Sequence, residues 1–174
     1  MIEAFGSLPA ALAAHPTSQE RCLSDRNAAR LLAAARTLSL RTLEREALDG
    51  PIFPTTAALI DYLHAGLAFS PVEQLRALFL DTHNRLILDE VLCSGTVNES
   101  ALFPREIIRR ALDVNATGLI LLHNHPSGDH EPSEADIRMT RNLARGLREI
   151  NVTLHDHLII GRAGWKSLRA EAIF

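Results

Sequence analysis

The chain has 174 residues, 47% of them hydrophobic and 22% charged, which suits a well-formed core in one domain of ordinary size or in a small domain with a helical extension. Its formal net charge of −3 excludes a protein that attracts nucleic acid through its overall charge. The two cysteines, Cys22 and Cys93, are far apart in sequence, which argues against a thiolate zinc site and a disulfide framework. No apolar run could span a membrane and no basic signal peptide opens the chain, so we expect a cytoplasmic protein without a membrane partner.

The first part of the chain, residues 1–50, predicts an N-terminal helical region. Ser24 or Asp25 can cap a helix over residues 27–40, where apolar residues recur at helical spacing. A second helix is expected over residues 40–48.

A connecting segment, residues 51–70, follows this helical region. The stretch 49–54 contains Asp-Gly and two prolines, which indicate a break in regular structure. Thr55 or Thr56 then caps a short helix over residues 57–67.

The remaining segment, residues 71–174, alternates strands with helices. In chain order we expect a β-hairpin (75–95), a helix beginning at Pro104, a strand (117–125), an amphipathic helix (133–150), a strand (152–161) and a short strand around Trp165. Strands interleaved with helices indicate an α/β or α+β layered domain.

The stretch HNHPSGDHEPSEAD contains the candidate chemistry. Residues i and i+2 of a strand point to one face, so His123 and His125 should lie side by side at the carboxyl end of their strand. Asp136, in the first turn of the next helix, can supply a third metal ligand. Three protein ligands leave one position open, as in catalytic zinc sites. The pair Ser133 and Asp136 also fits an ordinary capping box, which is a helix start without chemistry.

The combined spacing of these residues resembles the JAMM motif of the MPN-type (JAB) zinc metallopeptidases. From about Val72 to the end, the chain resembles the bacterial RadC family more narrowly, through ALFPREIIRRAL, TGLILLHNHPSGDHEPSEAD and VTLHDHLIIG. This resemblance implies an MPN-like mixed sheet flanked by helices. It also implies one Zn²⁺ per chain, bound by His123, His125 and Asp136, with Ser133 stabilising an oxyanion. The implied activity is hydrolysis of peptide or isopeptide bonds in a protein or peptide substrate.

The acid–base residue of such an enzyme is a glutamate upstream of the histidines. Glu90 is the first candidate, since it lies in a predicted strand that leads to a small glycine-containing turn. Glu106 is the second, because its helix directly precedes the histidine strand. For both residues the alternative is a solvated surface charge, which we favour for Glu106.

Other polar residues near this motif admit two interpretations. Asp129 can act as a substitute ligand, although an aspartate after a glycine is more typical of a turn. A second His-x-His, formed by His155 and His157, should share one strand face, with Asp156 opposite. The RadC resemblance includes a similar Asp-His pair and allows a supporting role beside the zinc. We favour packed or hydrogen-bonded strand histidines.

The alternative function is a non-catalytic, DNA-repair-associated module that binds nucleic acid or protein and holds a structural metal. Arginines 138, 141, 145 and 148 form a stripe that could follow a phosphate backbone, but the same spacing is the polar face of an amphipathic helix. Lys166 is the single lysine among 18 basic residues, so we attribute the stripe to a bias toward arginine and expect a solvated face.

The N-terminal region bears on the same alternative. Many RadC proteins carry there a helix-hairpin-helix segment whose Gly-x-Gly presents backbone amides to phosphate. The matching stretch here, residues 22–36, has no Gly-x-Gly. We therefore expect these helices to pack on the catalytic domain or on another subunit. The oligomeric state is not predicted.

Overall fold

A computed structural model describes residues 2–14, 16–23, 25–95 and 104–174. Within these ranges the elements in chain order are α1 (Ile2–Phe5), α2 (Leu8–Ala13), α3 (Pro16–Leu23), α4 (Arg26–Leu48), α5 (Ala57–Leu67), β1 (Gln74–Leu80), β2 (Leu86–Ser94), α6 (Pro104–Asp113), β3 (Gly118–Asn124), α7 (Glu134–Glu149), β4 (Thr153–Ile160) and β5 (Trp165–Ser167). No helix among these residues is long and apolar enough to cross a membrane.

The strands form one sheet in the order β2-β1-β3-β4-β5. The hairpin β1–β2 is antiparallel, as are β1–β3 and β4–β5, whereas β3 and β4 run parallel and are joined by the crossover helix α7. Every residue of β3 is buried, as the central strand of a covered sheet requires. The sequence-based expectation of an α+β fold with a mixed sheet flanked by helices is thus confirmed.

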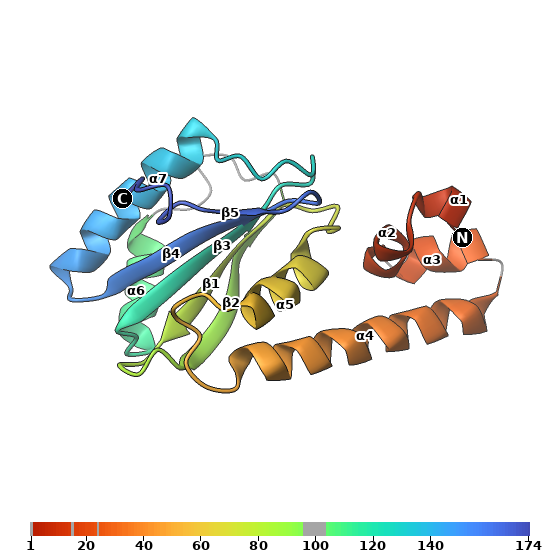
Figure 1. Ribbon diagram of the computed structural model, residues 1–174, viewed down its shortest axis with the longest axis horizontal. Coiled ribbons are helices and arrows are strands. Elements are labelled where there is room, and N and C mark those ends of the chain that lie inside the picture. The colour runs from red at the N-terminus through yellow and green to blue at the C-terminus, as the bar shows by residue number, and fades with distance from the viewer. Residues whose placement is uncertain (1, 15, 24, 96–103) are drawn as a thin grey trace.

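Helices cover both faces of the sheet (Figure 1). On one face α5 and the end of α4 pack on an apolar cluster that includes Leu59, Leu63, Leu78, Ile120 and Leu158. On the other face α6 and α7 pack on a cluster that includes Leu75, Phe79, Ile107, Leu121 and Leu143. Helix α5 therefore shares a core with the sheet, although it lies in the segment 51–70 that the sequence marks as connecting.

Helix α4 is continuous from Arg26 to Leu48, where the sequence predicted two helices. The stretch contains neither proline nor glycine, and the hydroxyls of Thr37 and Thr42 donate to carbonyls four residues earlier instead of interrupting the helix. Asp25 caps the helix by accepting from the Asn27 amide at 2.8 Å. Ser24, the other cap candidate, lies outside the described residues.

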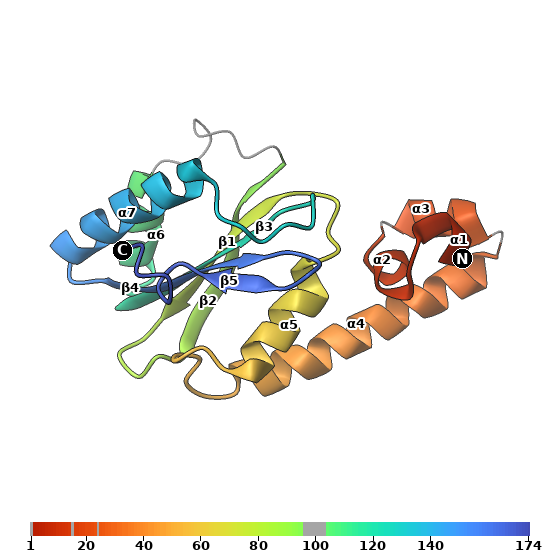
Figure 2. The same cartoon turned by 45° about the horizontal axis from the view of Figure 1, so that its top comes forward.

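The short helices α1, α2 and α3 gather around the N-terminal half of α4, away from the sheet (Figures 1 and 2). The buried Gln19 side chain donates to the Ala11 carbonyl at 2.7 Å, and Arg36 of α4 donates to the Ala13 carbonyl at 3.1 Å. These bonds join α2, α3 and α4 into one N-terminal bundle.

Candidate metal centre

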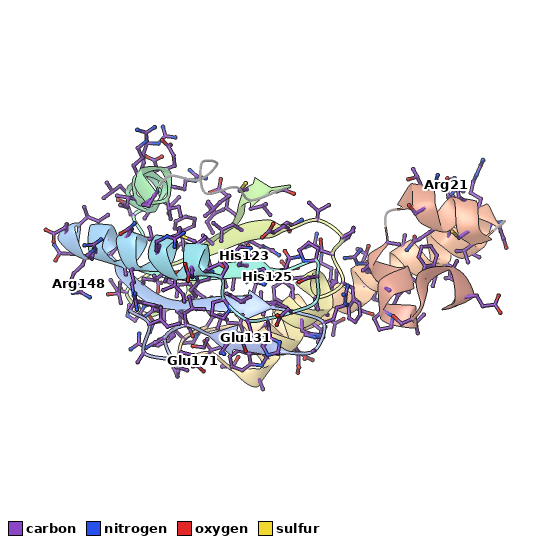
Figure 3. The ribbon with its side chains drawn as sticks, turned by 90° about the horizontal axis from the view of Figure 1, so that it is seen from above. Arg21, His123, His125, Glu131, Arg148 and Glu171 are labelled. Carbon is purple, nitrogen blue, oxygen red and sulfur yellow. The ribbon has the colours of Figure 1, made fainter. Side chains whose placement is uncertain are left out.

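Two histidines lie side by side at the carboxyl end of β3, as the alternation of a strand predicts. The ring centroids of His123 and His125 are 4.9 Å apart, and Figure 3 shows both side chains at this end of the sheet. His123 is buried, and His125, just past the strand, is partly exposed. The His125 amide donates to the Ile160 carbonyl at 3.2 Å, which extends the pairing with β4 by one residue.

Asp136 approaches both histidines from the first turn of α7. Its Oδ1 lies 3.3 Å from Nδ1 of His123, and its Oδ2 lies 3.6 Å from Nε2 of His125. Ser133 and Asp136 also form the capping box, because Ser133 Oγ accepts from the Asp136 amide at 3.1 Å while Asp136 Oδ2 accepts from the Ser133 amide at 2.8 Å. The two interpretations of this pair are therefore compatible, since capping fixes the carboxylate that faces the histidines.

The hydrogen bonds of the two imidazoles show which ring nitrogens are available to bind a metal ion. Nδ1 of His125 faces the Asp129 carbonyl at 3.2 Å, and because a carbonyl can only accept, Nδ1 carries a proton and Nε2 is the nitrogen that faces Asp136. Nε2 of His123 lies 2.7 Å from Glu73 Oε1, whereas its buried Nδ1 faces Asp136 Oδ1 at 3.3 Å but makes no hydrogen bond to any residue that the structure describes.

A cation fits this set of donor atoms. Zinc bonds of about 2.0–2.1 Å in tetrahedral geometry separate the ligand atoms by roughly 3.3 Å. The distances from Asp136 to the two imidazoles, 3.3 and 3.6 Å, are close to that separation. The buried Nδ1 of His123, which has no hydrogen bond among the described residues, would gain a bond to the ion.

The electrostatics of the cluster also favour a positive charge. Burial alone would raise the pKa of the Asp136 carboxyl, but the adjacent imidazoles of His123 and His125 and the hydroxyl of Ser133 outweigh burial and hold that pKa well below its ordinary value. Burial alone would lower the pKa of His123, yet the carboxylates of Asp136 and Glu73 outweigh it and raise the pKa. Two carboxylates thus flank one buried imidazole.

Glu73, which the sequence-based reasoning missed, completes this group. Its carboxylate, the His123 imidazole and the His125 imidazole offer ligand atoms within 4.8 Å of one another. Glu73 directly precedes β1, and the antiparallel pairing of Gln74 with Asn124 brings it beside the histidines. No local pattern in the sequence marks Glu73, since only the pairing of β1 with β3 brings it to the histidines.

The structure does not bring Glu90 to this group. In the sheet Glu90 is opposite Ala77, which is opposite Leu121, so it lies two strands and two residues away from His123, on the order of 10 Å. Its carboxylate accepts from Arg110 Nε of α6 at 2.6 Å and joins the edge strand to that helix.

Glu106, the second candidate for the acid–base residue, is on the outer face of α6. Its half-exposed carboxylate pairs with Arg109 at 3.0 Å and with Arg105 at 3.4 Å. These contacts are those of a surface ion pair.

Asn124, between the two histidines, holds the backbone around Glu73. Its buried side chain accepts from the Gln74 amide at 2.9 Å and donates to the Val72 carbonyl at 3.1 Å. On the other side the Glu73 carbonyl accepts from the Gly95 amide at 2.9 Å. The position of Glu73 is therefore fixed from two neighbouring strands.

The loop between His125 and α7 is fixed by the turn that follows β4. The Arg162 amide donates to the Gly128 carbonyl at 3.0 Å, and the Arg162 guanidinium donates to the carbonyls of Pro126 and Ser127. The backbone at Gly161 approaches so closely that an added Cβ would lie 2.5 Å from the Gly128 oxygen. Asp129 is a turn residue, since its Oδ1 accepts from the Glu131 amide at 3.0 Å.

The second His-x-His does not share one strand face, so that prediction is wrong. The β3–β4 register shifts between Leu154 and Asp156, and the extra residue turns His155 toward Phe53 on the α5 face. His157 is fully buried on the α7 face, with its ring centroid 6.2 Å from that of His123. Burial, and then the neighbouring His123, lower the pKa of His157 to about 3, so its imidazole is neutral.

The arginine stripe lies on the outer face of α7, where it lines a groove with Phe174. Arg141 donates to the Ile173 carbonyl at 2.8 Å, and Arg145 donates to Asn142 at 2.6 Å. The stripe thus helps to hold the C-terminal residues against the helix.

Comparison with known proteins agrees with this architecture. Residues 53–173 match the family described as RadC-like JAB domain. The chain is also 40% identical over 174 residues to a UPF0758 protein of Rhodobacter capsulatus, an alignment that covers 99% of this chain and 81% of the relative.

Proposed function

This chain belongs to the RadC-like JAB domain family, and we propose that it is a zinc-dependent hydrolase that cleaves peptide or isopeptide bonds. The observation that carries the proposal is the convergence of His123, His125, Asp136 and Glu73 at one end of the sheet, around a buried imidazole nitrogen that makes no hydrogen bond to a described residue. When bound, the metal supplies a positive charge that polarises a carbonyl and acidifies water.

His123, His125 and Asp136 would hold the metal. They come from three separate places in the fold, namely the end of β3, the loop after it and the first turn of α7. The capping box and the bond from His125 to the Asp129 carbonyl fix two of the three before any ion binds. This preorganisation supports a site for a resident metal.

Glu73 is the proposed acid–base residue, in place of Glu90. A carboxylate at this position can take a proton from the attacking water and pass it to the departing amine. Glu73 is partly exposed and lies 2.7 Å from the His123 imidazole, whereas the Glu90 carboxylate is bound to Arg110.

Ser133 is the proposed donor to the developing oxyanion. Its hydroxyl now donates to Asp136 Oδ2 at 2.6 Å, so the oxygen lies beside the ligand group. A hydroxyl can rotate about its C–O bond and offer its proton to a second acceptor. Removal of one oxyanion donor costs about 10²–10³-fold in kcat in a well-studied protease.

The test begins with the metal content of the purified chain by elemental analysis. We expect about one zinc per chain. A panel of peptides and isopeptide-linked peptides, followed by mass spectrometry, then identifies a cleaved substrate. Glu73→Gln should keep the zinc and lose about 10²–10⁴-fold in hydrolysis, while Glu90→Gln should stay near the wild type. Protein that is purified without zinc and does not bind added zinc would contradict the proposal.

The Glu73 variant also separates two roles for that carboxylate. If Glu73 moves a proton, Glu73→Gln leaves the zinc dissociation constant within a few-fold of the wild type. A large loss of zinc affinity would instead identify Glu73 as a metal ligand.

A further inference from the structure

The buried stripe of α7 begins with two polar residues. Asp136, Thr140, Leu143 and Leu147 recur at helical spacing and face the sheet. The two leucines join the apolar cluster beneath the helix, whereas Asp136 faces the histidines of β3 and Thr140 faces His157 of β4. Thr140 and His157 are both fully buried.

The hydrogen bonds of Thr140 have one consistent direction. Its Oγ1 lies 2.6 Å from the Asp136 carbonyl oxygen, which can only accept, so the hydroxyl proton is donated there. The same oxygen lies 2.7 Å from Nδ1 of His157 and must accept from that ring. His157 therefore carries its proton on Nδ1.

The His157 ring also lies against a proposed metal ligand. Its plane is inclined by 25° to that of His123, with a centroid distance of 6.2 Å. Thr140 and His157 thus form one buried pair. The Thr140 hydroxyl contacts the backbone of Asp136 on α7, and the His157 ring faces the ring of His123 on β3.

Ordinary packing does not account for this pair. A threonine that bonds to the carbonyl four residues earlier is common and proves nothing alone. The imidazole is different, because its Nε2 is buried and has no hydrogen-bond partner within the part of the chain that the structure describes. Burial of such an atom opposes folding, and an apolar residue in the same cluster would avoid that cost.

We infer that Thr140 and His157 are positioning residues, whose hydrogen bond fixes the first turn of α7 over β4 and so places the Asp136 carboxylate against His123 and His125. The inference rests on the proposed function, since it assumes that zinc binds to these side chains. Loss of the bond lets the helix start move, and zinc affinity falls while all three ligands remain. Substitution of residues that orient metal ligands typically costs about 10–100-fold in affinity.

The experiment measures the zinc dissociation constant of the full chain by competition with a chelator. Thr140→Val removes the hydroxyl at nearly constant volume and should weaken zinc binding about 10-fold or more. Thr140→Ser keeps the hydroxyl and should stay within about 3-fold of the wild type. His157→Asn can place an amide N–H near the position of Nδ1, so it should weaken binding less than His157→Leu.

A purely structural role gives a different pattern. Thr140→Val would then lower the melting temperature of the metal-free protein and leave the zinc dissociation constant unchanged, which would overturn the inference. Wild-type protein without zinc binding would overturn the proposed function and, with it, the inference.

A measurement on the wild type covers the case in which Thr140→Val does not fold. The ¹⁵N chemical shifts of His157 distinguish its two neutral tautomers. We expect the proton on Nδ1, and a proton on Nε2 would overturn the inference.

Discussion

The chain contains the pattern His-x-His twice, on neighbouring parallel strands, and the two copies have different environments. In the first copy, at the end of β3, both rings turn to one side and meet Asp136. In the second, within β4, His155 packs on Phe53 at one face while His157 is buried at the other.

The difference comes from the backbone and not from the side chains. The pairing of β1 with β3 is regular through Asn124, so side chains alternate between the two faces and the two histidine rings lie on the same side. In β4 one residue more than in β3 is accommodated, and alternation fails at that point. Spacing in a sequence therefore locates a metal site only where the strand has no irregularity.

Loss of the first histidine pair should have the largest effect. His123→Ala with His125→Ala removes two of three proposed ligands, and we expect no zinc in the purified protein. His155→Ala is the matched control and should keep about one zinc per chain. Elemental analysis of both proteins measures this, and equal zinc in the two would place the metal elsewhere.

The close contact between the turn after β4 and the loop after His125 offers the next test. Gly161 follows β4, and a Cβ there would lie 2.5 Å from the Gly128 oxygen in the loop after His125. Gly161→Ala should displace that loop, lower the free energy of unfolding by about 1–3 kcal/mol and weaken zinc binding.

Gly164→Ala is the control for this substitution, because its Cβ would meet only the His130 ring at 3.7 Å, an ordinary contact. Chemical denaturation and zinc competition measure both variants. Equal behaviour of the two would show that the loop does not depend on the Gly161 contact.

Acid should distinguish the two histidines of β4. The pKa of His157 is lowered to about 3, so below the unfolded value near 6.5 the unfolded chain binds a proton that the folded chain excludes. The contribution of His157 to the free energy of unfolding is fully present above pH 6.5. It is lost as the pH falls toward 3, by at most about 1.4 kcal/mol per pH unit.

His157→Asn removes this contribution and should flatten the pH dependence of unfolding in metal-free protein. Burial, and then Arg169, also lower the pKa of the half-buried His155, and we expect a smaller change for His155→Asn. Urea titrations from pH 4 to 7 measure the slopes. Identical slopes in all three proteins would contradict the burial of a neutral imidazole at position 157.

The smallest effect is expected from the arginine stripe of α7, which faces away from both histidine pairs. Arg145→Ala with Arg148→Ala should leave zinc content unchanged, because no proposed ligand contacts these side chains. We also expect no steep salt-dependent DNA binding in the wild type by fluorescence anisotropy. Binding that falls steeply with salt and disappears in the variant would revive the nucleic-acid alternative.

Local pattern was sufficient for most of the fold. The hairpin, the helix beginning at Pro104 and the strand before the histidines all have the expected type, since each has its own turn, proline or apolar run. The same holds for the grouping of His123, His125 and Asp136, which depends on one strand, one loop and one helix start.

Residues whose position depends on strand pairing were not predictable in this way. Glu73 reaches His123 only because β1 lies antiparallel to β3, and Glu90 points to α6 because its register with Ala77 places it farther along the sheet. His155 faces away from His157 because of a register shift between β3 and β4, and no residue type in the sequence predicts that shift. Long-range pairing and irregular backbone are properties of the folded sheet rather than of any short segment.

The unbroken course of α4 has a mechanical consequence. Its 23 residues span about 35 Å, with one end in the core beneath the sheet and the other end in the bundle of α1, α2 and α3. A single helix transmits both direction and rotation, so the bundle has a set orientation toward the rest of the molecule. Insertion of one residue in the middle of α4 would swing the bundle by about 100° around the helix axis and advance it by about 1.5 Å.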